Sequence, residues 1–224
     1  MPDLPSYDIA DLALAPAGAQ RIAFAEQAMP VLSRLRERFA QTRPLHGVTI
    51  SACMHVTAET AVLARVLTAA GARLHLAASN PLSTQDDVAA SLVADHGVAV
   101  HARRGVERGD YLSHLEAAVA AGPQLVLDDG VDLVALLHAS PGLLEGVRGG
   151  CEETTTGVLR LRQMAADGAL RLPMVAVNDS PVQLLVANRH GTGQSVLDAV
   201  MRATGTLLAG STVVVAGYGW CGAG

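Results

Sequence analysis

The stretch Thr212-Val-Val-Val-Ala-Gly-Tyr-Gly-Trp-Cys-Gly-Ala-Gly224 is the part of the sequence that indicates the fold most directly. Its run of β-branched residues is typical of a buried strand and leads into Gly217-x-Gly219-x-x-Gly222. In a strand–turn–helix unit such glycines allow a tight turn, let the backbone approach a pyrophosphate, and let the helix pack on the strand. The pattern predicts the start of a dinucleotide-binding domain. Because the sequence ends at Gly224, we expect the chain to contain only the first strand of that domain.

Upstream of this stretch, short apolar segments alternate with segments whose apolar residues recur at helical spacing. The alternation predicts an α/β fold, in which a doubly wound parallel sheet has helices on both faces. We expect strands at 47–52, 73–78, 98–102, 124–127, 174–177 and 212–216. We expect helices at 59–70, 85–95, 110–121, 153–166 and 194–204, after two helical stretches within 16–39 that are broken near Pro30.

The composition indicates a globular protein that acts on small molecules. Half of the 224 residues are hydrophobic, and only 3% are aromatic, so Ala, Leu and Val must build the core. A net charge of −5 with scattered Arg residues argues against nucleic-acid binding. The N-terminus lacks the features of a signal peptide and no apolar run is long enough to span a bilayer, so we expect no membrane partner and a cytoplasmic location. Three cysteines without CxxC spacing predict neither a disulfide framework nor a metal site.

Polar clusters follow several of the expected strands. Ligands of open parallel sheets bind beyond the carboxyl ends of the strands, so this repeated order favours a polar pocket for a small molecule. Each cluster also has a simpler interpretation: Ser83 and Thr154 suit helix N-caps, Asp128 and Asp129 suit a turn, and His55 alone is more often structural. The clusters lie at 53–60, 79–87, 128–132, 152–157 and 178–180.

Seven segments carry a resemblance to a known family: CMHVTAETAVLARVL (53–67), SNPLSTQDDVAA (79–90), LVLDDGVDL (125–133), RGGCEETTTGVLRL (148–161), VNDS (177–180), NRHGTGQS (188–195) and VVVAGYGWCGAG (213–224). Together they resemble the adenosylhomocysteinase (S-adenosylhomocysteine hydrolase) family, in its archaeal and bacterial branch. The resemblance implies reversible hydrolysis of S-adenosylhomocysteine to adenosine and homocysteine, by means of an NAD that oxidises the ribose 3′-hydroxyl. It also implies a substrate-binding domain at 1–208, the start of an NAD-binding domain at 209–224, and a homo-oligomer.

The same resemblance implies a role for individual residues and no metal. The adenosine moiety would be bound by His55, Thr57, Glu59 and Thr60, together with Asp129 and Glu153, which would also act as catalytic acid/base groups. The nicotinamide side of NAD would contact Thr154, Thr155, Thr156 and Asn188, and its pyrophosphate would contact Gly217, Gly219 and Gly222.

The stretch after Asn178 departs from the family pattern. Family members typically have a Lys and an Asp where this chain has Gln183 and Ala187. A Lys beside a carboxylate can take a proton from a hydroxyl during hydride transfer, which Gln cannot do, and Ala cannot accept a hydrogen bond from a ribose. We therefore expect this chain to lack the oxidation step. We also expect it not to retain NAD by itself, because the helix and the ribose-binding acid that would follow Gly222 in such a site are not in the sequence. The alternatives are a non-catalytic adenosine-binding or regulatory paralogue and a non-functional gene fragment.

Overall fold

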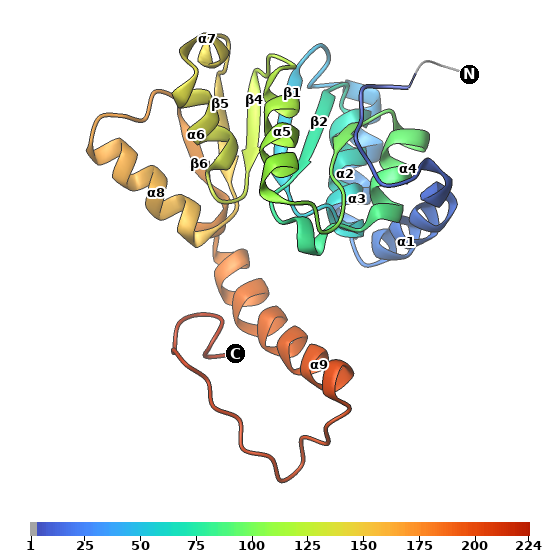
Figure 1. Ribbon diagram of the computed structural model, residues 1–224, viewed down its shortest axis with the longest axis vertical. Coiled ribbons are helices and arrows are strands. Elements are labelled where there is room, and N and C mark those ends of the chain that lie inside the picture. Colours follow the sequence, from blue (N-terminus) through green and yellow to red (C-terminus); the bar gives the residue numbers. More distant parts are fainter. Residues whose placement is uncertain (1–3) are drawn as a thin grey trace. The chain divides into compact units, whose positions relative to one another are not determined.

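The computed structural model describes residues 4–224, which divide into two compact units (Figure 1). The first unit ends at Val175 and the second runs from Ala176 to Gly224. The two units thus meet earlier in the sequence than residue 208, where we expect the substrate-binding domain to end. The domain boundary at residue 208 stays a prediction. Among residues 4–224, the helices are too short or too polar to cross a lipid bilayer.

A six-stranded sheet in the order β3-β2-β1-β4-β5-β6 forms the centre of the fold. All pairs with an assigned register are parallel, which confirms the doubly wound α/β class expected from the sequence. The strand order reverses between β1 and β4, and this switch point is where open sheets of this kind bind their ligands. The strands are β1 (Thr49–Met54), β2 (Arg73–Ala78), β3 (Ala99–His101), β4 (Leu125–Asp128), β5 (Gly149–Glu152) and β6 (Met174–Ala176).

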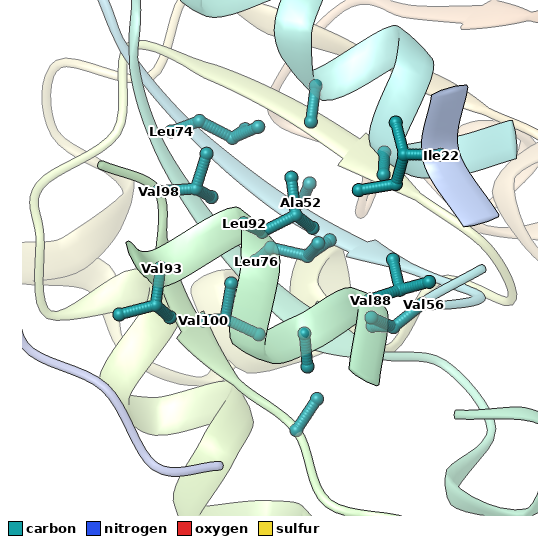
Figure 2. Close-up of a cluster of buried hydrophobic side chains, with 14 of the residues drawn as sticks. Ile22, Ala52, Val56, Leu74, Leu76, Val88, Leu92, Val93, Val98 and Val100 are labelled. Carbon is teal, nitrogen blue, oxygen red and sulfur yellow. The ribbon is translucent and has the colours of Figure 1, made fainter. Parts of the chain in front are cut away.

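Helices cover both faces of the sheet, and alternate residues of the strands face opposite ways. Ile50 and Ala52 of β1 lie in one apolar cluster with residues of the first helices, as Figure 2 shows for Ala52. Cys53 belongs to a second cluster, and the hydroxyl of Ser51 donates to the carbonyl of Ala118 at 2.6 Å on that side. The first face carries α1 (Ala15–Gln27), α3 (Ala58–Ala69) and α4 (Asp86–His96), with α2 (Pro30–Thr42) against α3. The second carries α5 (Arg108–Val119), α6 (Asp132–Ala139) and α8 (Thr155–Ala166), with the short α7 (Pro141–Leu144) after α6.

The expected break near Pro30 is confirmed. The first helix ends at Gln27 and the second begins at Pro30, which occupies a position where the missing N–H of proline costs no helical hydrogen bond. Within residues 4–224 there are three short 3-10 helices. The first unit contains η1 (Leu12–Leu14) and η2 (Pro81–Ser83), and the second contains η3 (Val177–Asp179).

Strand β5 was missed by the sequence analysis, which placed only a polar cluster in this region. Its Gly149-Gly150-Cys151-Glu152 sequence has no β-branched residue. The strand forms because β4 offers it an edge, with Leu125 opposite Gly149 and Asp128 opposite Glu152. Gly150 fits there because a side chain at this position would meet the carbonyl of Val126 at 2.5 Å and the sulfur of Met174 at 3.0 Å.

The prediction of a strand at 212–216 is wrong for the described residues. Residues 211–215 have no regular structure, and the side chains of Val213, Val214 and Val215 are exposed. A strand needs the N–H and C=O groups of a neighbour, and within residues 4–224 none pairs with this segment. The second unit instead contains a π-helix, η4 (Gln183–Gly191), that continues into α9 (Thr192–Thr204), which ends at a left-handed Gly205.

Candidate active site

Side chains that follow β1, β2 and β4 meet at the switch point of the sheet. Nε2 of His55 lies 3.4 Å from Oδ2 of Asp129, and the hydroxyl of Ser79 donates to the same oxygen at 2.9 Å. The Asp129 side chain is only 9% exposed, whereas that of His55 is 49% exposed. The carboxylate of Asp129 is thus largely buried, and the imidazole of His55 is half-exposed.

Ser83 orients the ring of His55. Its hydroxyl donates to the carbonyl of Asn80 at 2.9 Å and lies 2.6 Å from Nδ1 of His55. Because the Ser83 hydroxyl donates its only proton to the Asn80 carbonyl, its oxygen must be the acceptor in the contact with His55. Nδ1–H of His55 is then the donor in that contact. The other ring nitrogen, Nε2, faces Asp129. Ser83 does not cap the following helix, as one interpretation of the sequence suggested, because Gln85 occupies the N-cap of α4.

Glu153 joins this group from the end of β5. Its backbone N–H donates to the carbonyl of Asp128 at 3.0 Å, which continues the pairing of β4 with β5. Burial raises the pKa of the Glu153 carboxyl, and the neighbouring charges of Asp129 and Glu152 raise it further. A carboxyl group with a raised pKa exchanges its proton closer to neutral pH, as general acid/base catalysis requires.

Beneath these groups lie two fully buried carboxyl groups, those of Asp128 and Glu152. Oδ2 of Asp128 accepts from the N–H of Val134 at 2.9 Å, and Oδ1 accepts from the N–H of Asp129 at 3.1 Å. Burial raises the pKa of Asp128 to about 7 although these hydrogen bonds oppose the shift. Sequence reasoning gave no site role to Ser79 or Glu152, although both lie in the polar clusters that it singled out.

The other residues expected at the adenosine lie at the start of α3. Thr57 is the N-cap residue of this helix, Glu59 is exposed in its first turn, and Thr60 is half-buried. The N–H of Ala58 donates to Oε1 of Gln85 at 3.0 Å, which ties the loop after β1 to the loop after β2. The segment from His55 to Thr60 is thereby held at the carboxyl end of β1, and the contacts of its side chains with a ligand stay predictions.

The threonines expected at the nicotinamide begin α8. Thr154 is its N-cap: the Thr154 hydroxyl accepts from the N–H of Gly157 at 3.0 Å and donates to Oε1 of Glu152 at 2.9 Å. These contacts confirm the helix-cap interpretation of Thr154. Thr155 and Thr156 are exposed in the first helical turn. Their contacts with NAD stay predictions.

The remaining cofactor candidates lie in the second unit. Nε2 of Gln183 is 3.5 Å from Oδ1 of Asn188, and Ala187 is exposed on the same π-helix. Further on, Gly217 has a left-handed φ of 114°, and the N–H of Ala223 donates to the carbonyl of Gly219 at 2.9 Å. A side chain at Gly222 would meet the carbonyl of Gly217 at 2.5 Å. These glycines thus form a tight turn, and their contact with a pyrophosphate stays a prediction.

No cluster of three His, Cys, Asp or Glu residues suited to a metal ion is found in the part of the chain that the structure describes. All three cysteines are free thiols. Burial raises the pKa of Cys53 well above its ordinary value, so this thiol is a packed core group.

Comparison with known sequences gives the family. The sequence model of S-adenosyl-L-homocysteine hydrolase matches residues 6–141 and 140–184. The chain belongs to this family. An adenosylhomocysteinase of Aquifex aeolicus is 56% identical over 97% of this chain and 52% of its own length, and one of Gloeobacter violaceus is 56% identical over 97% and 51%. An S-inosyl-L-homocysteine hydrolase of Methanocaldococcus jannaschii is 49% identical over 97% and 52%. This member of the S-adenosyl-L-homocysteine hydrolase family spans about half the length of these curated relatives.

Proposed function

We propose that this chain is the substrate-binding part of an adenosylhomocysteinase, and that it binds the adenosine moiety of S-adenosylhomocysteine without hydrolysing it. The observation that carries the proposal is the convergence of His55, Ser79, Asp129 and Glu153 at the switch point of the sheet. The family relationship supplies the class of ligand.

The arrangement suits a nucleoside with free ribose hydroxyl groups. The Asp129 and Glu153 carboxyl groups are acceptors for such hydroxyls, and Glu153, whose pKa burial raises, is suited to hold or release a proton there. Nε2 of His55 is a further polar group beside Asp129 that a ribose hydroxyl could contact. When bound, NAD supplies the hydride acceptor for the 3′-carbon. Gln183 has no group that could take the 3′-hydroxyl proton, so we propose that this chain does not perform the oxidation.

Two bases, adenine and hypoxanthine, are candidates for the nucleoside that this chain binds. Relatives of similar identity are named for S-adenosyl and for S-inosyl homocysteine, at 56% and 49%. Adenine and hypoxanthine differ in the hydrogen-bonding groups on the six-membered ring, so a protein that binds one through those groups discriminates against the other. The resemblance that places Thr57 and Glu59 at the adenosine favours adenosine as the first ligand to test.

Calorimetric titration of the chain with adenosine, inosine and cytidine tests the proposal. We expect binding of adenosine, no binding of cytidine, and at least tenfold weaker binding in Asp129→Asn and Glu153→Gln, since a hydrogen bond to a charged group contributes roughly 1.5–3 kcal/mol. Glu116→Gln, at an exposed position of α5, is the matched control. Equal binding of all three nucleosides, or none, would contradict the proposal, and preference for inosine would assign the second candidate.

We further propose that the chain is cytoplasmic and self-associates, as the family resemblance implies. Cell fractionation tests the location. Sedimentation equilibrium tests self-association, and a single monomeric species across the micromolar range would contradict it.

A further inference from the structure

Glu152 is fully buried at the end of β5 and bonds to two separate loops. Its Oε1 accepts from the N–H of Gly130 and from both the N–H and the hydroxyl of Thr154, each at 2.9 Å. Its Oε2 accepts from the N–H of Val131 at 3.1 Å. These four donors replace the water that an isolated carboxylate would need, so the buried charge is accommodated by backbone and hydroxyl dipoles.

The two loops are those that carry the candidate acid/base groups. Asp129 immediately precedes Gly130 in the turn between β4 and α6, and Glu153 lies between Glu152 and Thr154 ahead of α8. Asp128 and Glu152 are paired in register, so Asp129 and Glu153 leave the sheet side by side. Glu152 therefore links the two segments just outside the sheet, where strand pairing no longer holds them.

The backbone around Gly130 has the shape that an anion requires. Gly130 and Val131 have left-handed φ values of 114° and 71°, so their consecutive N–H groups both point to the Glu152 carboxylate. A left-handed conformation is strained for a β-branched residue such as Val131 and persists only where surrounding contacts impose it. Removal of the carboxylate would leave the N–H groups of Gly130 and Val131 without their hydrogen-bond acceptor.

Gly157 provides the space for the carboxylate. It lies in the first turns of α8, and a Cβ built at this position would overlap the carboxyl group of Glu152. Alanine is otherwise the more favourable residue in a helix, by roughly 1 kcal/mol in general. The structure thus contains a strained valine on one side of Glu152 and an unfavourable helical glycine on the other.

We propose that Glu152 is a positioning residue, which locks the β4–α6 turn to the β5–α8 turn and so sets the placement of Asp129 relative to Glu153. That Glu152 sets the positions of Asp129 and Glu153 follows from the structure alone. That these positions matter for ligand binding rests on the proposed function. Glu152 acts through its neighbours and does not itself contact the ligand.

The test is the titration of Glu153, followed by carbon-detected NMR of the side-chain carboxyl and assigned with Glu153→Gln. Glu152→Asp keeps the carboxyl group but is one methylene too short to reach both turns, so we expect the pKa of Glu153 to fall toward its ordinary value as Glu153 moves into water. Glu145→Asp, at an exposed position, is the matched control and should leave it unchanged. The amide protons of Gly130 and Val131 should exchange about tenfold faster or more in Glu152→Asp, because each loses a hydrogen bond to a charged group.

Gly157→Ala is an independent variant that displaces the carboxylate while keeping Glu152, and it decides the matter if Glu152→Asp does not fold. We expect it to shift the Glu153 titration in the same direction. A folded Glu152→Asp or Gly157→Ala protein with the wild-type titration and amide exchange overturns the proposal. So does a result in which Glu152→Gln shifts the titration and Glu152→Asp does not, because the effect is then one of charge alone. Failure of the wild type to bind adenosine would overturn the proposed function and leave these measurements valid.

Discussion

Asp128 and Asp129 are adjacent residues with opposite environments. Consecutive side chains of an extended segment point to opposite sides, so Asp128 is fully buried while Asp129 contacts His55 and Ser79 at the site. The simple turn interpretation of this pair therefore misses its main feature, which is that the Asp128 carboxyl group accepts backbone hydrogen bonds and the Asp129 carboxyl group contacts His55 and Ser79.

Burial of Asp128 gives stability a pH dependence that can be measured. Its pKa is about 7 in the folded protein against 3.8 for the ordinary group, so between pH 4 and 7 the folded state keeps a proton that the unfolded state loses. Stability must fall as pH rises through this window. We expect wild-type protein to lose stability relative to Asp128→Asn from pH 4.5 to 7.5, measured by urea unfolding. Parallel curves for the two proteins would contradict the assignment.

The ring of His55 is held at both nitrogens, and we expect its replacement to weaken nucleoside binding. In His55→Asn the side chain no longer reaches both Ser83 and Asp129. Loss of a hydrogen bond to a charged group predicts roughly tenfold weaker adenosine binding or more by calorimetry. The exposed His46→Asn is the control. An unchanged affinity in His55→Asn would remove His55 from the site.

At the scale of elements, α1 packs on α4 through a glycine. Gly18 is buried in α1, where an added Cβ would overlap the carbonyl of Asp87 and lie 3.0 Å from Cβ of Ser91. We expect Gly18→Ala to lower the free energy of unfolding by about 1–3 kcal/mol, because the helices must separate to admit the methyl group. Gly109→Ala in α5 meets nothing within 4 Å and should instead be neutral or stabilising by up to about 1 kcal/mol. Urea unfolding of both variants provides the measurement, and equal effects would contradict the packing argument.

At the scale of the whole molecule, we expect the activity of a completed enzyme to depend on Gln183 and Ala187. We expect the purified chain to carry no NAD, as judged by mass spectrometry of denatured protein. We also expect negligible hydrolysis of S-adenosylhomocysteine when the chain is joined to the remaining half of a related enzyme. Gln183→Lys with Ala187→Asp in that fusion should restore about 10²–10⁴-fold in rate, the usual contribution of an acid/base group. Activity of the unmodified fusion within about tenfold of the double variant would show that these positions do not carry the oxidation step.

Local patterns were enough to predict most helices and five of the six strands. The apolar runs at 47–52 and 73–78 lie within or overlap β1 and β2, and helical spacing located α3, α4, α5 and α8. These features follow from side-chain periodicity along short segments, which the sequence contains directly. The order of polar clusters after strands likewise predicted which end of the sheet carries the site, since all parallel strands end at the same edge.

Tertiary structure decided what depends on neighbours. The glycine-rich segment of β5 is a strand because β4 pairs with it, whereas the valine-rich segment at 213–215 has no partner in the described chain and forms none. Contacts at the site also depend on neighbours that are distant in the sequence. Ser83 and His55, which are 28 residues apart, form a hydrogen bond, and so do Glu152 and Gly130, which are 22 residues apart. Sequence by itself determined the residue types and the family, but hydrogen bonds between distant residues exist only once the sheet has brought their loops together.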